Sequence, residues 1–196
     1  MKHLTLRELV LCGLFIALIT AGTFIRIPVG TDVYTLQFLF TLLAGLVLGA
    51  RLGAIAVGTY VLLGLLGVPV FAAGGGPAYL LQPTFGYLLA FILQAWLGGR
   101  YARRGAAVSY GRLLAANLLG MAVVYVIGIG WFYLISNYAI NAPIPLWTAI
   151  FYCGVLQALP DFLLCLAAAA IGLRCQQSGI WIEEMGSAAD HKEVCA

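Results

Sequence analysis

Charged side chains are scarce in this sequence. Asp, Glu, Lys and Arg make up 9% of its 196 residues, whereas hydrophobic residues make up 63%. The mean hydropathy is +1.03. A water-soluble domain of this length needs a charged surface, and the seven acids and ten bases present cannot supply one. The composition therefore excludes a soluble globular fold and predicts an integral membrane protein.

Motifs that carry common chemistries are also missing. The chain has no GxxxxGK[ST] sequence, which excludes a P-loop nucleotide site. Its two histidines, His3 and His191, lie outside every apolar run, which argues against a Ser/His hydrolase or a His-ligated metal. The five cysteines form no CxxC pair. We therefore expect no metal, no cofactor and no enzymatic activity.

Apolar runs separated by polar breaks predict an all-α protein with six transmembrane helices. The "GARLG" stretch alone separates the second and third runs, which indicates a tight helical hairpin. Residues 1–174 would form one membrane domain, followed by a polar cytoplasmic tail over 175–196. The predicted spans cover roughly residues 7–25, 35–50, 52–66, 79–99, 112–135 and 147–173.

Basic residues are distributed unequally about these spans. If the N-terminus lies in the cytoplasm, nine of the ten Lys and Arg residues fall on that side and Arg26 alone falls outside. This bias predicts that both termini are cytoplasmic. The cluster of Arg100, Arg103 and Arg104 is then a topology signal or a lipid contact rather than a nucleic-acid site.

The connection between the third and fourth predicted spans has an unusual composition. It reads "GVPVFAAGGGPAYLLQPTFGYLLAF" over residues 67–91 and contains no charge. Glycine-rich backbone at membrane depth is tolerated only where protein or a water-filled cavity satisfies its polar groups. We therefore expect a structured rim or lid over a cavity at the outer face, rather than a disordered loop.

Asp161 is the only acid inside any predicted span. Burying a carboxylate in lipid is costly, so such a residue usually faces a cavity or a partner. Pro160 lacks an N–H group and would loosen the helix at this point, and Gln157 lies one turn back on the same face. We expect Asp161 and Gln157 to bind a ligand, although a neutral Asp161 bonded to another helix is the alternative.

Further polar residues gather at the predicted outer ends of the spans. Gln82, Gly86, Ala90 and Gln94 recur every fourth residue, which predicts one helical face on which the deeper Gln94 serves to hold helices together. The other candidate ligand-binding residues in this region are Gln82, Thr84, Gln37 and Tyr34.

Small residues form a stripe on the first predicted span. Gly13, Ala17 and Ala21 follow a small-xxx-small spacing, which allows another helix to approach closely. The sequence alone leaves open whether that helix belongs to a partner or to this chain.

Four stretches of the sequence are especially distinctive: "TLQ", "LLAGLVLGARLGA", "LGLLGVPVFAAGGG" and "QPTFGYLLAF". They resemble the BioY family, the biotin-specific S components of energy-coupling-factor transporters. The resemblance extends to about residue 173 and is strongest over 24–91. It implies a six-helix S-component fold in the prokaryotic plasma membrane that captures biotin at the outer face. Partners would be a transmembrane scaffold, docked on the stripe of Gly13, Ala17 and Ala21, and two cytoplasmic ATPases.

The resemblance also implies roles for site residues. Asp161 and amides such as Gln82 would bind the ureido ring of biotin, and Tyr87 would enclose the apolar body. The last span of the family usually reads P-G-D-x-x-K, but Leu164 occupies the Lys position here. A ligand carboxylate would then be bound by the N-terminus of the fourth span or by Arg26.

Other functions remain open at this point. One is an S component for another small apolar acid such as lipoate, and the others are an intramembrane enzyme or a small channel. The candidate polar residues gather in the outer half of the predicted bundle, which favours capture over conduction.

Overall fold

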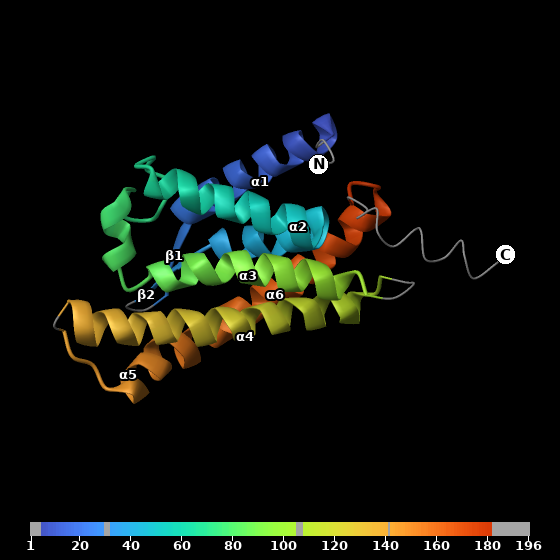
Figure 1. The fold of residues 1–196 in the computed structure, drawn as a ribbon. Coiled ribbons are helices and arrows are strands. Elements are labelled where there is room, and N and C mark those ends of the chain that lie inside the picture. The colour runs from blue at the N-terminus through green and yellow to red at the C-terminus, as the bar shows by residue number, and fades with distance from the viewer. Residues whose placement is uncertain (1–4, 30–31, 105–107, 141, 182–196) are drawn as a thin grey trace.

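The computed structural model describes residues 5–29, 32–104, 108–140 and 142–181, with the side chains of 26–29 and 32–34 left undescribed. The helical membrane protein predicted from composition is confirmed, with one addition, a short antiparallel hairpin that pairs Arg26 with Thr35. Figure 1 shows the helices side by side in one bundle. In chain order the elements are α1 (Leu6–Phe24), β1 (Arg26–Val29), β2 (Asp32–Thr35), α2 (Gln37–Leu65), the 3₁₀ helix η1 (Pro77–Leu81), α3 (Phe85–Ala102), α4 (Tyr110–Leu134), the π-helical η2 (Ile135–Ala139), α5 (Leu146–Ile150), the π-helical η3 (Phe151–Val155) and α6 (Leu156–Gln177).

Four helical segments are long and apolar enough to cross a membrane within the described part of the chain. They are Leu6–Phe24, Gln37–Leu65, Tyr110–Ala139 and Leu146–Gln177. Three boundaries differ from the predicted spans by four residues or more. Helix α3 begins at Phe85 rather than near residue 79, because η1 occupies the preceding segment. The segment that starts with α4 continues to Ala139 rather than ending near residue 135, and α6 continues past residue 173 to Gln177.

Helix α2 reverses direction at Gly49. This residue has φ 88° and ψ −179°, a conformation that is essentially restricted to glycine. The Gln37 amide donates a hydrogen bond to the Tyr60 hydroxyl over 3.1 Å, although 23 residues of straight helix would separate them by about 35 Å. The two parts of α2 are therefore antiparallel, and they turn within the "GARLG" stretch.

Glycines allow the backbones of α2 and α3 to pack directly against each other. A Cβ atom on Gly45 would lie 2.6 Å from the carbonyl oxygen of Ala95, and one on Gly99 would lie 2.5 Å from the backbone nitrogen of Ala50. Real Cβ atoms do not approach other atoms so closely, so only glycine fits at either position. Direct backbone packing between α2 and α3 therefore closes the half of the bundle in which α3 ends.

The connection after α2 is packed against the core. Phe71 is 1% exposed, its ring lies 5.6 Å from that of Tyr60 and 4.5 Å from that of Tyr79, and a Cβ atom on Gly64 would overlap it. Positive φ angles of 103°, 105° and 110° at three glycines, Gly67, Gly74 and Gly76, allow the necessary turns. The glycine-rich segment is therefore a structured rim.

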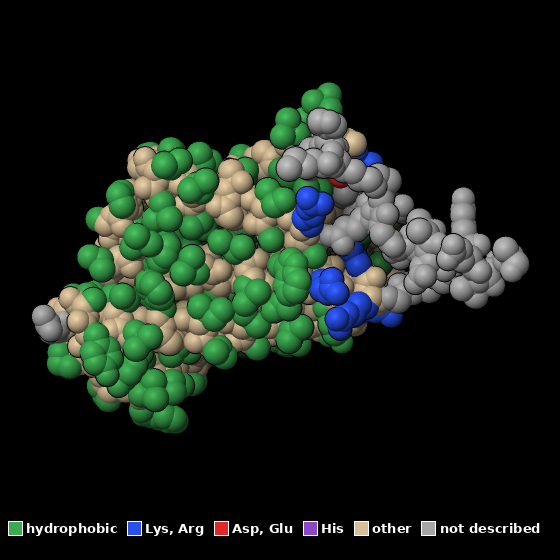
Figure 2. All heavy atoms as spheres, viewed as in Figure 1, with side chains coloured by type: hydrophobic (Ala, Val, Ile, Leu, Met, Phe, Trp, Pro, Cys, Tyr) green, Lys and Arg blue, Asp and Glu red, His purple; other side chains and the backbone are tan. Residues whose placement is uncertain are grey.

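Basic residues collect at one end of the molecule. Figure 2 shows arginine side chains at the end where α3 finishes, while many hydrophobic side chains, with backbone and other atoms between them, lie over the body of the molecule. Arg103 lies at this end and donates to the carbonyl oxygens of Leu46 and Val47 over 3.2 and 3.0 Å. Those carbonyls are in the last turn before Gly49, and carbonyls in the last turn of a helix generally lack helical N–H partners, so Arg103 caps the first part of α2.

Candidate ligand-binding site

A cavity of about 430 Å³ lies between α2, α3, α4 and α6, a size typical of small-molecule sites. It is lined by residues near the start of α3, whereas Arg100 lies in the last turn of that helix and Arg103 directly follows it. The cavity therefore lies toward the end of the bundle opposite to these arginines. Its apolar and aromatic wall consists of Phe38, Ala72, Tyr79, Tyr87, Leu88, Phe91, Val124, Phe132, Tyr152 and Cys153. Its remaining lining residues are Thr35, Gln37, Thr84, Gln157 and Asp161.

Asp161 is the acidic residue of the cavity. Its side chain is 4% exposed, and its Oδ2 atom accepts a hydrogen bond of 2.8 Å from the hydroxyl of Tyr125 on α4. No basic side chain is among the described residues that line the cavity. A buried carboxylate without a cation needs further hydrogen-bond donors, which a ligand with N–H groups would provide.

The backbone around Asp161 departs from a regular α-helix. Pro160 lies inside α6, directly before the acid, and the π-helical turn η3 precedes α6. That turn brings Tyr152 and Cys153 to the cavity wall. Single π-helical turns within longer helices often occur at functional sites, and here the turn adds two lining residues that the sequence pattern did not indicate.

Five of the eight predicted ligand-binding residues line this one cavity. They come from three helices and the residue before α3, and they are Gln37, Thr84, Tyr87, Gln157 and Asp161. The backbones of Arg26 and Tyr34 lie in the β1–β2 hairpin, but their side chains are outside the described part of the structure.

Gln82 does not line the cavity, contrary to its predicted place. Its side chain is exposed, and its backbone forms the C-terminal cap of η1 instead of continuing α3. The four-residue spacing from Gln82 to Gly86 therefore does not mark one helical face. The face does run through Gly86, Ala90 and Gln94, all of which are buried.

Tyr125 is the principal residue that the sequence pattern missed. It lies in the middle of α4 and does not itself line the cavity, but it contacts Asp161. Tyrosines of membrane helices usually lie at the interfaces with water. A tyrosine far from both ends of a long apolar helix is thus a signal that a polar partner lies nearby.

The small-residue stripe on α1 faces away from the bundle. Gly13, Ala17 and Ala21 are all exposed, and a Cβ atom on Gly13 would have no neighbour within 4 Å. The buried residues of α1, which include Phe15 and Ile19, lie on a different face. Within the described part of the chain, the stripe is therefore not used to seat another helix.

Comparison with known proteins gives consistent results. The chain is 35% identical to the probable biotin transporter BioY of Lysinibacillus sphaericus over 175 residues, which is 89% of each chain. It is 38% identical to the probable biotin transporter BioY of Pyrococcus horikoshii over 172 residues, covering 87% of this chain and 96% of that one. It is 43% identical to the biotin transporter BioY of Thermotoga maritima over 125 residues, or 63% of this chain and 73% of the relative.

A solved structure has the same fold. It is the crystal structure of the S-component for biotin from an ECF-type ABC transporter, with a TM-score of 0.76 and 26% sequence identity. The match covers 89% of this chain and 95% of that one. The sequence model of the BioY family matches residues 1–179. The chain therefore belongs to the BioY family.

Proposed function

We propose that this chain is the S component of an energy-coupling-factor transporter and captures biotin at the outer face of a prokaryotic plasma membrane. The observation that carries the proposal is the cavity, which combines a buried carboxylate with amides and aromatic walls in a chain of the BioY family. Membership of this family also means that the chain is a transport protein and not an enzyme.

The chemistry of the cavity matches the two parts of biotin. The ureido ring carries two N–H groups, and Asp161 offers an acceptor for a charge-assisted hydrogen bond while Tyr125 holds its other oxygen. Gln37 and Gln157 add amide groups to the same cavity. Aromatic side chains such as Tyr87 and Phe91 would enclose the apolar rings and chain.

Arg26 is our candidate for the ligand carboxylate. Leu164 replaces the lysine that is usual in the family, and the described cavity lining contains no base. The support for Arg26 is its backbone position, since it pairs in the hairpin with Thr35, which lines the cavity. The N-terminus of α3 at Thr84 and Phe85 is the alternative anion site.

The proposed topology has six crossings and both termini in the cytoplasm. The reversal of α2 at Gly49 supports two crossings from that segment. The gathering of arginines at one end of the bundle supports a cytoplasmic assignment for that end, as the positive-inside rule requires. The cavity then opens toward the outer face.

The proposed partners are a transmembrane scaffold and two cytoplasmic ATPases. The absence of a P-loop motif from the sequence means that nucleotide hydrolysis has to come from other subunits. The exposed stripe of Gly13, Ala17 and Ala21 supports close helix packing against a scaffold within the bilayer.

Calorimetric titration of the purified protein with biotin and with lipoate tests the ligand. Lipoate has an apolar ring and a carboxylate but no N–H group, so the buried acceptors would lose their water without gaining donors. We expect biotin to bind and lipoate to bind at least about a hundredfold more weakly. Equal affinities, or a preference for lipoate, would contradict the assignment.

A further inference from the structure

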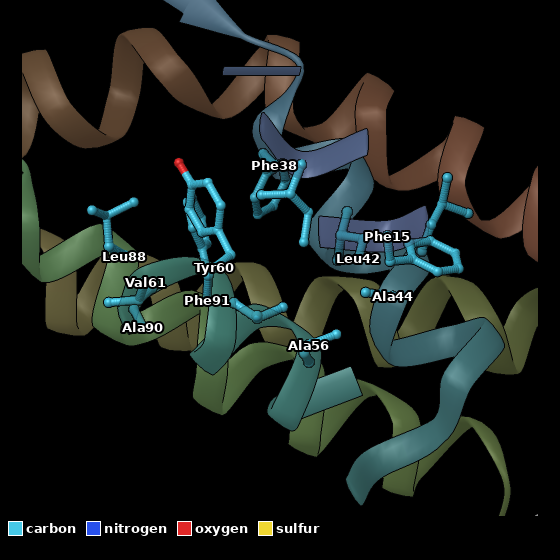
Figure 3. Packing of buried hydrophobic residues seen from close by; sticks show 14 of the residues in the cluster. Phe15, Phe38, Leu42, Ala44, Ala56, Tyr60, Val61, Leu88, Ala90 and Phe91 are labelled. Carbon is cyan, nitrogen blue, oxygen red and sulfur yellow. The ribbon is translucent and has the colours of Figure 1, made fainter. Parts of the chain in front are cut away.

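A buried hydroxyl joins three elements behind the cavity wall. Tyr60 is 0% exposed, and its oxygen accepts a hydrogen bond of 3.1 Å from Nε2 of Gln37. The same hydroxyl donates to the carbonyl oxygen of Val70 over 3.1 Å and lies 3.1 Å from Oγ1 of Thr23. Figure 3 shows the Tyr60 ring inside the hydrophobic cluster, with its hydroxyl oxygen pointing away from Ala56.

Gln37 belongs to the cavity wall, whereas Tyr60 does not. The hydroxyl therefore contacts a candidate ligand-binding side chain from behind. It also contacts the rim segment after α2, through Val70, and the outer part of α1, through Thr23. One polar group thus connects the cavity to the two elements beside it.

The number of protons at this hydroxyl fixes the orientation of the Gln37 amide. A tyrosine hydroxyl has one proton to donate, and the acceptors that compete for it are the Val70 carbonyl and the Thr23 oxygen. The Thr23 hydroxyl also reaches the Ile19 carbonyl at 2.9 Å. When that proton goes to either of these acceptors, the Tyr60 oxygen has none left for Gln37, and the amide then turns its NH₂ group toward Tyr60, in agreement with the 3.1 Å contact of its Nε2 atom.

Gln37 then keeps its carbonyl oxygen as the acceptor for a ligand. Asp161 supplies a second acceptor on the opposite helix, and its orientation is fixed in the same way by Tyr125. A site with two fixed acceptors discriminates against ligands that lack donors, because unpaired buried acceptors are costly.

We infer that Tyr60 is a positioning residue for ligand specificity, which holds the Gln37 amide so that its oxygen accepts from an N–H group of the ligand. The identity of that ligand as a cyclic urea rests on the proposed function. The role of Tyr60 itself rests on the hydrogen bonds to Gln37 and Val70.

A double-mutant cycle tests whether Tyr60 acts through Gln37. Tyr60→Phe keeps the ring and removes the hydroxyl, and we expect biotin to bind about tenfold more weakly. In a Gln37→Ala background the same change should cost no further affinity, because the group that Tyr60 orients is gone. Thr23→Val is the matched control, since it removes a hydroxyl from the same cluster but leaves the Gln37 bond, and it should stay within about twofold of wild type. Additive losses, or an equal loss in Thr23→Val, would show a general packing role instead.

A second measurement needs no ligand and no folded Tyr60 variant. The chain has six glutamines, so selective ¹⁵N labelling gives a small set of side-chain amide signals, and Gln37→Ala identifies the Gln37 pair. We expect the Gln37 amide protons of the wild-type protein to exchange with solvent at least tenfold more slowly than those of the exposed Gln82. Equal exchange rates would overturn the role of Tyr60. If wild-type protein fails to bind biotin, the proposed function is wrong. The exchange rates would still test whether Tyr60 holds the Gln37 amide.

Discussion

At the scale of single residues, the Asp161 carboxylate is the most unusual group of the molecule. It is almost completely buried, its Oδ2 atom accepts a hydrogen bond from Tyr125, and no basic side chain is among the described residues that line its cavity. Such a group costs free energy in the unliganded protein, since burial removes water from a charge. Functional sites often contain such buried charges, because a bound ligand can supply the hydrogen bonds that offset the cost of burial.

Replacement of Asp161 by Asn should weaken biotin binding by about ten- to a hundredfold. A charge-assisted hydrogen bond contributes about 1.5–3 kcal/mol, and the amide keeps the shape but not the charge. Titration calorimetry measures the affinity and thermal unfolding measures stability, which we expect to change little. Normal binding together with a lowered unfolding temperature would mean that Asp161 is a structural residue.

Leu164 allows a separate test of how the ligand carboxylate is bound. An exposed ion pair contributes about 0–1 kcal/mol, so biotinamide should bind wild-type protein within about tenfold of biotin. Leu164→Lys restores the residue that is usual in the family, and we expect folded protein in which biotin is favoured over the amide more strongly than in wild type. Leu164→Met serves as the control of similar volume. A loss of biotin binding of more than a hundredfold in Leu164→Lys would mean that the cavity is shaped for another ligand.

At the scale of elements, the reversal of α2 decides the architecture around the cavity. Gly49 provides a backbone conformation that other residues rarely adopt. Arg103 caps the carbonyls of Leu46 and Val47 beside it, and its guanidinium group lies 4.9 Å from the Trp181 ring. The reversal places Gln37 and Tyr60 next to each other, so a turn at one end of the bundle determines a contact at the other.

Substitution of Gly49 by Ala should lower the free energy of unfolding by roughly 1–3 kcal/mol, because alanine is strained at this φ and ψ. Gly58→Ala is the matched control in the same helix, where a Cβ atom meets nothing within 4 Å. That change should be neutral or slightly stabilising, since alanine is the better helix former. Thermal unfolding in detergent measures both variants. Equal unfolding temperatures would show that the turn at Gly49 is not needed for stability.

At the scale of the whole molecule, surface chemistry separates the two ends of the bundle. Arginines occupy the end where α3 finishes, and the cavity with its glycine-rich rim lies toward the other. Between them the visible surface is largely hydrophobic, as a lipid-facing surface requires. This difference between the two ends supports the proposed orientation, with the arginine end in the cytoplasm and the cavity end outside.

Cysteine labelling of whole cells tests that orientation. In a variant whose own cysteines are replaced, Ala73→Cys in the rim should react with a membrane-impermeant maleimide added outside. Arg104→Cys, at the arginine end, should react only after the cells are opened. The reverse pattern would invert the topology, and labelling of both sites from outside would contradict six crossings.

Docking to a scaffold should depend on the stripe of α1. Gly13→Leu combined with Ala17→Leu should leave biotin affinity within about twofold of wild type and abolish co-purification of the scaffold. Leucines on this exposed face would hold helices apart without touching the cavity. Val126→Leu adds bulk to α4 at a position that is 76% exposed and should change neither result. Recovery of the scaffold at wild-type yield by the double variant would exclude the stripe as the docking surface.

The sequence by itself determined the class of the molecule and several of its key residues. A chain with few charges and long apolar runs is stable in lipid rather than in water, so these two features predicted a helical membrane protein. The cost of a buried carboxylate marked Asp161, and an uncharged glycine-rich segment marked the packed rim around Phe71. Each of these conclusions depends on local composition, which folding does not change.

The tertiary structure decided which residues share the cavity. Tyr125 and Asp161 are 36 positions apart and meet only because α4 packs on α6. Gln82 was wrongly assigned to a face of α3 because the four-residue spacing extends back beyond Phe85, where the helix begins. Periodicity describes one segment at a time, whereas a binding site forms where separate segments pack together, and that packing depends on the shapes of all of them.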